Sequence, residues 1–199
     1  MSSPTPHRVV IRFAAIALFG VALAGLFWAT RPQPKPAAEI NRNLLVLHEG
    51  RLCLRDQTYP FTGFMVETNE NGALLSRSAV SNGLLEGLSE GFYTNGQKQI
   101  AEHFRAGVSD GLRTKWHPNG RKLSEAAIVE GKLHGTFRRW FEDGALAEEI
   151  EINQGEPHGS ARSYYPSGFL KVQARMEAGK MLEQKSWQDG EFRPASSDG

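Results

Sequence analysis

Hydrophobic and polar residues alternate in short runs from about residue 60 to residue 179. In one such run Ile150 and Ile152 are apolar, while Glu149 and Glu151 occupy the intervening positions. A side-chain period of two puts apolar residues on one face of a β-strand and polar residues on the other. The pattern therefore predicts a series of short strands, each with one dry face and one wet face.

The alternation recurs with a period of 24 residues over five copies, without insertions. Three glycine series keep this spacing: Gly63, Gly87, Gly111, Gly135 and Gly159; Gly72, Gly96, Gly120, Gly144 and Gly168; and Gly83, Gly107, Gly131, Gly155 and Gly179. Asn, Asp or Ser precedes each glycine of the second series, and these residues favour turns, while glycine itself adopts positive φ without strain. Pro118 and Pro166 favour a type I turn with a glycine bulge in their copies, and a type I′ turn stays open for the others.

Each copy therefore predicts a β-hairpin. We expect the first strand to follow the Gly63-type glycine and to end on two aromatic residues, and the second strand to end at the third glycine series. The next hairpin then opens at the pairs Asp110-Gly111, His134-Gly135 and His158-Gly159. A single hairpin is marginal in water, so the hairpins must stack to bury a continuous face. The predicted fold class is all-β: tandem hairpin repeats that form an elongated antiparallel sheet or solenoid, roughly 48 Å long.

The rest of the chain divides into segments on either side of the repeats. We predict a short N-terminal tail at residues 1–12, a transmembrane anchor at 13–30, a proline-rich linker at 31–39 and a strand pair at 40–59 that leads into the repeats. The repeats occupy residues 60–179, and residues 180–199 form a degenerate cap and a loose tail. The last copy is degenerate because Glu183 replaces a series glycine and Gly190 arrives early.

Residues 13–30 are 18 consecutive uncharged, mainly apolar residues. As a helix they would cover roughly 27 Å, close to the hydrocarbon thickness of a bilayer. A cleavable signal peptide is the alternative, but Phe27 and Pro36 are poor residues before a cleavage site, so we expect an uncleaved anchor. Basic residues flank both ends and do not decide the orientation. The short leading tail and the large following domain favour a single-pass protein with a cytoplasmic N-terminus and a repeat domain on the periplasmic or other extracytoplasmic side.

Charge and cysteine content exclude some classes of function. The chain has 23 basic and 22 acidic residues, and three of the basic residues lie in the N-terminal 31 residues, which contain no acid. The remainder is slightly acidic, so no basic field is present to bind nucleic acid. Cys53 is the single cysteine, which excludes an intramolecular disulfide and a cysteine-based zinc site. We expect Cys53 to act as a small, half-buried apolar residue.

The spacing of aromatic residues and glycines carries a resemblance to a known family. The stretch GLRTKWHPNGRKLSEAAIVEGKLHGTFRRWFEDG resembles tandem MORN repeats of the bacterial variant kind, including the YwqK-like antitoxin family. The likeness covers about residues 60–179, although Thr68 and Asn69 replace the aromatic pair in the first copy. The resemblance implies a non-enzymatic binding or scaffold protein that is antitoxin-like, and it transfers no catalytic residue.

The aromatic residues come in adjacent pairs, and neighbouring strand residues face opposite sides. We predict that one series is structural and packs in the core: Phe92, Trp116, Trp140 and Tyr164. The other series would then form an exposed stripe that binds a partner: Tyr93, His117, Phe141 and Tyr165. Packing of this second series against neighbouring hairpins is the alternative. The glycines of the Gly72 series are predicted to be structural.

No arrangement of residues indicates catalysis, a metal or a cofactor. His134 and His158 fall in equivalent turns about 10 Å apart, too far to share a metal ion. The glutamates of the second strands recur as part of the repeat, which is typical of solvated strand faces. We therefore expect a membrane-anchored scaffold whose partner is another protein. The alternatives are a module that binds lipid or a cell-envelope polymer, and an enzyme.

Overall fold

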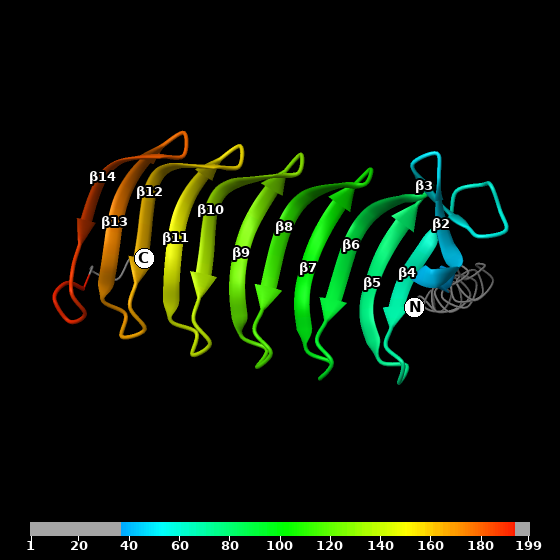
Figure 1. The fold of residues 1–199 in the computed structure, drawn as a ribbon, viewed down its shortest axis with the longest axis horizontal. Helices are drawn as coiled ribbons and strands as arrows, with labels where there is room; N and C mark the ends of the chain where they lie inside the picture. The colour runs from blue at the N-terminus through cyan, green and yellow to red at the C-terminus, as the bar shows by residue number, and fades with distance from the viewer. Residues whose placement is uncertain (1–36, 194–199) are drawn as a thin grey trace, which may run out of the picture. The chain divides into compact units, whose positions relative to one another are not determined.

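The computed structural model describes residues 37–193, and these residues form an all-β structure. Twelve strands lie side by side in one sheet in the order β1-β4-β5-β6-β7-β8-β9-β10-β11-β12-β13-β14 (Figure 1). All neighbours pair antiparallel except β1 and β4, which are parallel. The strands are β1 (Glu39–Asn41), β4 (Gly63–Thr68), β5 (Leu74–Ser81), β6 (Leu84–Phe92), β7 (Lys98–Arg105), β8 (Val108–Trp116), β9 (Lys122–Val129), β10 (Lys132–Trp140), β11 (Leu146–Asn153), β12 (Glu156–Tyr164), β13 (Leu170–Glu177) and β14 (Lys180–Ser186). The predicted all-β fold of tandem hairpins is confirmed.

The strand boundaries follow the 24-residue period. Strands β6, β8, β10 and β12 begin at residues 84, 108, 132 and 156, and β5, β7, β9, β11 and β13 show the same spacing from residue 74. Residues 24 positions apart therefore occupy equivalent places in successive hairpins. The glycine series of the sequence correspond to three distinct backbone features of each hairpin.

The Gly72 series forms the turns at one end of the sheet. Gly96 has a φ of 82° and donates its N–H to the Tyr93 carbonyl at 2.9 Å, while Tyr93 N–H bonds the Gln97 carbonyl. The Asn95 side chain accepts from Gln97 N–H and closes the turn. This is the type I turn with a glycine bulge, and the same backbone bonds occur in all five copies. The turn predicted from Pro118 and Pro166 thus extends to every copy.

The Gly83 series forms the two-residue turns at the other end. Both central residues have positive φ, as in Asn82 at 49° and Gly83 at 77°, which defines a type I′ turn. The glycine N–H of each turn also reaches back to the preceding hairpin: Gly107 bonds the Leu85 carbonyl and Gly131 bonds the Ser109 carbonyl, both at 2.8 Å. These bonds couple each hairpin to its predecessor.

The sequence prediction for the Gly63 series, that these glycines open the hairpins, was wrong. Gly111 and Gly135 do not open a hairpin but lie inside β8 and β10, so the first strand of each hairpin starts three residues earlier than expected. Each of these glycines has positive φ, 124° at Gly111 and 77° at Gly135, and the pairing of β10 with β9 shifts register beside Gly135. The series therefore supplies a bend within the strand. His134 and His158 accordingly lie in strands rather than in turns.

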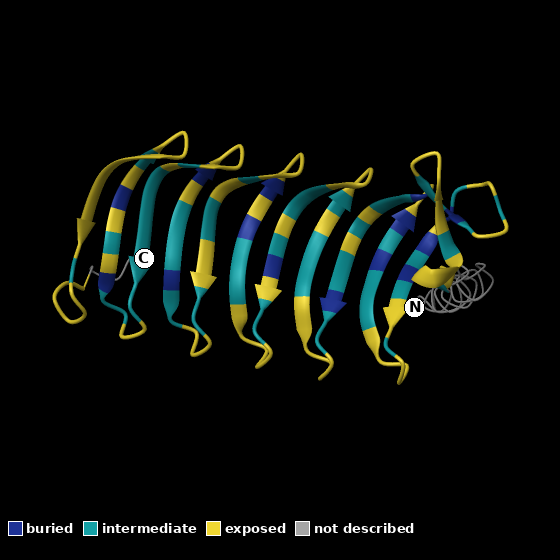
Figure 2. Cartoon of the chain, viewed as in Figure 1, coloured by how far each residue is buried: buried dark blue, intermediate teal, exposed yellow. Residues whose placement is uncertain are grey.

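The buried side chains follow the predicted alternation (Figure 2). One face of the sheet, which we call the apolar face, carries most of the buried residues of the second strands, among them Ser78, Val80, Ala126, Ile128, Ile152 and Ala174. The opposite face, which we call the charged face, carries the intervening residues such as Arg77, Glu125 and Glu149. Few side chains are fully buried, since a single-layer sheet has no second layer to cover it.

A separate strand pair covers the start of the sheet. Strands β2 (Leu45–His48) and β3 (Arg51–Leu54) form a two-stranded sheet, and a 3₁₀ turn (Arg42–Leu44) precedes them. Leu52 N–H donates to the Gly83 carbonyl, and Gly83 N–H donates to the Phe61 carbonyl, both at 2.8 Å. Phe61, Met65 and Val80 form a small core there, and Cys53 is 1% exposed. Cys53 is therefore more deeply buried than predicted.

The C-terminal residues up to 193 are docked onto the last hairpin and do not form a loose tail. Leu170 N–H donates to the Phe192 carbonyl at 2.9 Å, and Trp187 N–H donates to the Lys171 carbonyl at 3.1 Å. The rings of Trp187 and Phe192 stack with centroids 5.3 Å apart. The segment replaces the missing sixth turn and covers Leu170, which is 1% exposed.

The predicted anchor at residues 13–30 lies outside the described residues. Within the part of the chain that the structure describes, no helix has the length and apolar character needed to cross a bilayer.

Candidate functional site

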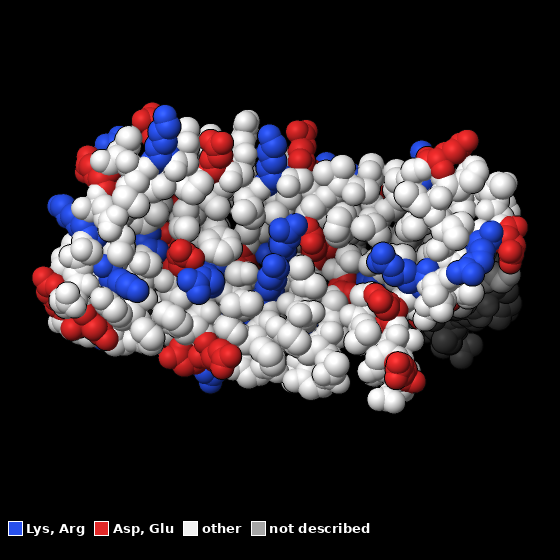
Figure 3. All heavy atoms as spheres, in the orientation of Figure 1, with Lys and Arg blue, Asp and Glu red and all other residues white. Residues whose placement is uncertain are grey.

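A row of charged side chains crosses the charged face at one level. The backbone pairing places its members directly opposite one another on successive strands, with Ala101, Thr114 and Gln173 filling the remaining places. From β5 to β14 the charged members are Arg77, Glu90, Glu125, Arg138, Glu149, Arg162 and Lys185. We call this set the charged row. Figure 3 shows acidic and basic side chains interspersed along the molecule rather than gathered at one pole.

Opposite charges in the row form ion pairs. Glu149 bonds Arg138 at 2.7 Å and lies 3.6 Å from Arg162, so one carboxylate bridges two guanidinium groups on flanking strands. Glu125 instead pairs with Lys122 at 2.6 Å, and Arg77 with Glu39 of β1 at 2.9 Å. These groups are partly exposed, so each pair contributes little to stability. Their fixed spacing does give the face an ordered pattern of charge.

Beyond the charged row, the same face exposes an apolar patch near the middle of the sheet. The patch consists of Leu88, Val108, Leu112 and Val129, which are 39–50% exposed. Leu88 lies opposite His103, and Leu112 lies opposite Ala127, in neighbouring strands. The equivalent positions of later copies are polar, with Thr136 and Ser160 in place of Leu88 and Leu112. The patch is therefore confined to the middle copies.

The structure places both aromatic series in half-buried positions. Phe92, Trp116, Trp140 and Tyr164 end the first strand of their hairpins, and Tyr93, His117, Phe141 and Tyr165 begin the turns. None of the eight belongs to the buried core, which is made of aliphatic side chains together with Cys53 and Phe61. Burial raises the pKa of Tyr164 above its usual value, so its hydroxyl stays neutral at physiological pH.

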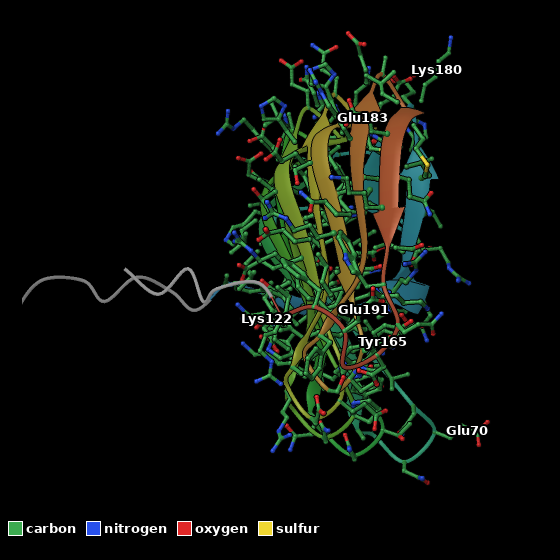
Figure 4. All side chains as sticks on the ribbon, turned by 90° about the vertical axis from the view of Figure 1, so that its left-hand side faces the viewer. Glu70, Lys122, Tyr165, Lys180, Glu183 and Glu191 are labelled. Carbon is green, nitrogen blue, oxygen red and sulfur yellow. The ribbon has the colours of Figure 1, made fainter. Side chains whose placement is uncertain are left out.

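The polar tips of the second aromatic series bridge successive hairpins. Tyr93 Oη donates to the Trp116 carbonyl at 2.8 Å, His117 Nε2 lies 3.0 Å from the Trp140 carbonyl, and Tyr165 Oη donates to the Trp187 carbonyl at 3.1 Å. Figure 4 shows Tyr165 beside the C-terminal segment. This geometry gives the series a structural contact. The use of the same ring faces to bind a partner remains a prediction.

We expect Tyr93→Phe to lower the free energy of unfolding by about 1 kcal/mol, because it removes one bond between hairpins and leaves the Trp116 carbonyl without its donor. Urea denaturation of both proteins measures the difference. Tyr59→Phe is the control, since Tyr59 is 62% exposed, and its effect should be close to zero. Equal stability of Tyr93→Phe and wild type would show that the bridge contributes nothing.

A polar cluster interrupts the apolar face. The Glu102 carboxylate accepts hydrogen bonds from Ser109 Oγ and Arg113 Nη2, and its side chain is only 12% exposed. Burial by itself raises the pKa of Glu102, but the bonds from Arg113 and Ser109 and the charges of Arg113 and Lys115 outweigh it and lower the pKa. Glu102 is therefore ionised and paired at neutral pH, an arrangement that suits a structural ion pair better than a proton donor.

We expect Glu102→Gln to be less stable than wild type at pH 7, with the gap closing in acid. A folded-state pKa below the ordinary value of 4.5 stabilises the fold above that pH, and the contribution disappears as the pH falls through the lowered pKa. Thermal unfolding of both proteins from pH 7 to pH 3 measures the gap. Glu67→Gln, at an exposed carboxylate, should follow wild type throughout. A gap for Glu102→Gln that does not change with pH would indicate a packing defect instead.

The hollows of the described structure are shallow and open. One of about 450 Å³ lies between β12, β13 and β14, and smaller ones lie beside His134 and His158. Within residues 37–193, no three His, Cys, Asp or Glu side chains are grouped as metal ligands. The chemistry available on these surfaces is ion pairing, hydrogen bonding and apolar contact.

Comparison with known proteins identifies the repeat. Residues 133–154, which span most of β10 and β11, match the MORN repeat variant. The equivalent backbone of the other copies extends the same unit along the sheet, and a MORN repeat suggests a repeat-based binding module. This match does not confirm the predicted resemblance to the YwqK-like antitoxin family.

Other comparisons add little. No curated protein matches the chain. Two solved structures, one of an S. aureus TarM mutant in complex with Fondaparinux, alpha-GlcNAc-glycerol and UDP and one of TarM, share 12% and 13% identity with this chain, with TM-scores of 0.33 and 0.32. The likeness covers 49% of this chain and 19% of each TarM chain, and it carries no argument about function.

Sequence reasoning missed the charged row and the apolar patch. Both depend on cross-strand register, which shifts by one residue at the turns and by two residues beside the Gly63 series. The opposite signs of Glu125 and Arg138, or of Glu149 and Arg162, were the available signal. Comparing each charged residue with the residue 13 positions later would have found these two pairs of opposite charges.

Proposed function

We propose that this chain is a non-enzymatic scaffold that binds another protein along its repeat sheet. The observation that carries the proposal is the single-layer construction, which leaves the charged face of the repeats open to solvent. Repeat proteins use such extended, rigid surfaces for binding. The open hollows favour a partner that lies on the surface over a small substrate held in a cleft.

The charged face combines the features of a protein-binding surface. Leu88, Val108, Leu112 and Val129 provide an exposed apolar centre, and the charged row provides polar groups along one side of it. Protein interfaces are built in this way, with an apolar core and a polar rim. A patch confined to the middle copies would fix the position of the partner along an otherwise periodic sheet.

The proposed setting is the membrane. The apolar residues 13–30 would anchor the chain as a single-pass protein, and the linker at 31–39 would hold the sheet away from the bilayer. The partner protein would then be one of the same membrane or of the adjoining compartment. An antitoxin-like role, in which the sheet covers the active surface of a toxin, is the specific form that the MORN resemblance favours.

The test is capture of a partner by the full-length chain from detergent-solubilised membranes. We expect a protein to co-purify with wild type and to be lost with Leu112→Ser, which places a hydroxyl in the apolar patch. Leu74→Ser is the matched control, because Leu74 is a similarly exposed leucine outside the patch, and it should retain the partner. Equal capture by both variants would contradict the assigned surface. Retention of envelope polysaccharide or lipid in place of any protein would contradict the scaffold function itself.

A further inference from the structure

The two edges of the sheet differ in the segments that lie beside them. At the N-terminal edge β1 pairs with β4, and the β2–β3 hairpin covers the adjoining turn through Leu52 and Gly83. At the C-terminal edge β14 is the last strand, and all seven of its residues are exposed. The docked segment after β14 bonds to Leu170 and Lys171 of β13, so no segment within residues 37–193 pairs with the outer edge of β14.

Figure 4 looks onto this edge. Strand β14 stands at the front with Lys180 and Glu183 marked along it, and the C-terminal segment with Glu191 curves below it near Tyr165. An edge strand carries unpaired backbone N–H and C=O groups that can pair with another extended strand. Strand β14 contains no proline that would block such pairing.

The side chains beside the edge select the chemistry of an incoming strand. The hollow of about 450 Å³ is lined on the charged face by Ser160, Arg162, Gln173, Arg175, Glu183 and Lys185. Three of these six are cations and one is a carboxylate. Within residues 37–193, Arg175 and Lys185 have no carboxylate partner, whereas Arg162 reaches Glu149 at 3.6 Å.

The charged row points to the same chemistry. Glu149, Arg162, Gln173 and Lys185 lie opposite one another on β11 to β14, so the row ends on a cation at the open edge. Opposite charges pair across strands and like charges repel. A further strand would place its side chain beside Lys185 in the same row, and an acidic side chain fits that place.

We propose that the β14 edge binds an extended, acidic peptide segment of a partner protein by β-strand addition. Backbone bonds to β14 hold the segment, and an aspartate or glutamate side chain opposite Lys185 enters the hollow, where the cations outnumber the one carboxylate, Glu183. This inference rests on the proposed scaffold function and specifies one mode of partner binding. It is separate from the apolar patch, which lies on the middle copies.

The test uses two acetylated seven-residue peptides with the full-length chain in detergent. Both peptides are valine-rich; one carries a single aspartate at its central position, and the other carries a lysine there. We expect the aspartate peptide to bind at least about tenfold more tightly, as measured by fluorescence anisotropy. It should also slow hydrogen exchange at the backbone amides of β14 by about tenfold or more, and not at strands in the middle of the sheet.

Charge reversal at the edge provides the control. Lys185→Glu should weaken binding of the aspartate peptide by about tenfold and strengthen binding of the lysine peptide. Lys132→Glu makes the same change in net charge on the exposed surface of β10 and should leave both affinities unchanged. No binding of the aspartate peptide, protection at another strand, or protection of β14 through self-association without peptide would each overturn the inference. If Lys185→Glu still captures the partner protein, the β14 edge is not its binding site, and the proposed scaffold function is unaffected.

Discussion

Gly83→Ala should lower the free energy of unfolding by about 3 kcal/mol or more. Gly83 has a φ of 77°, so any Cβ there carries left-handed strain. The added Cβ would also lie 2.7 Å from Arg51 Cβ and 3.0 Å from the Leu52 backbone N and O. Those atoms belong to β3, so the β2–β3 hairpin that covers this turn must move. Urea denaturation gives the energy, and hydrogen exchange at Leu52 reports the displaced strand.

Gly155→Ala separates strain from contact. Gly155 occupies the same turn three hairpins later with a φ of 93°, but the nearest atom to its added Cβ is Lys132 Cβ at 4.0 Å. This variant should cost about 1 kcal/mol, the backbone strain alone. Equal losses for the two variants would mean that β3 yields freely and that the covering hairpin adds nothing to stability.

Leu170→Ala is the second large effect, at about 2–5 kcal/mol. Leu170 is 1% exposed because the C-terminal segment docks over it, and its N–H bonds the Phe192 carbonyl. Removing three carbons leaves a cavity beneath that segment. Calorimetric unfolding measures the loss, and Trp187 fluorescence should report a loosened segment at temperatures well below the main transition.

Leu182→Ala is the matched control on the neighbouring strand. Leu182 is 51% exposed on β14, so its truncation should change the free energy of unfolding by less than about 0.5 kcal/mol. A small effect of Leu170→Ala, similar to that of Leu182→Ala, would show that the C-terminal segment does not pack on the last hairpin in solution.

The sequence was sufficient for the fold because period and turn chemistry agreed. A 24-residue spacing of glycines and a period-two alternation leave few arrangements other than stacked hairpins. The predicted starting positions of the first strands were wrong for a physical reason. Asp110-Gly111 has the composition of a turn, whereas the real turn at Ala106-Gly107 holds an alanine at a φ of 49°, which local preference disfavours. There the Gly107 N–H bond to the preceding hairpin helps to hold the strained alanine.

The arrangement of side chains on the surface was harder to predict from the sequence than the fold. The identity of Lys185 or Leu112 says nothing by itself about which side chains lie beside it on neighbouring strands. That information depends on cross-strand register, which bulges shift by one residue at the turns and by two residues beside the Gly63 series. The docked C-terminal segment was missed because Gly190 falls outside the period, although Trp187 continues the aromatic series one residue early.

The bonds from each two-residue turn reach back by one hairpin and no further. Cohesion between units is therefore local, and a whole unit of 24 residues could be added or removed in the middle without changing how its neighbours dock. Lineages that vary the number of units would change the length of the sheet by one unit at a time, while the N-terminal strand pair and the C-terminal strand β14 stay the same. The distance between the end that carries β2 and β3 and the end that carries β14 is thus a quantity that evolution can set in steps of one unit.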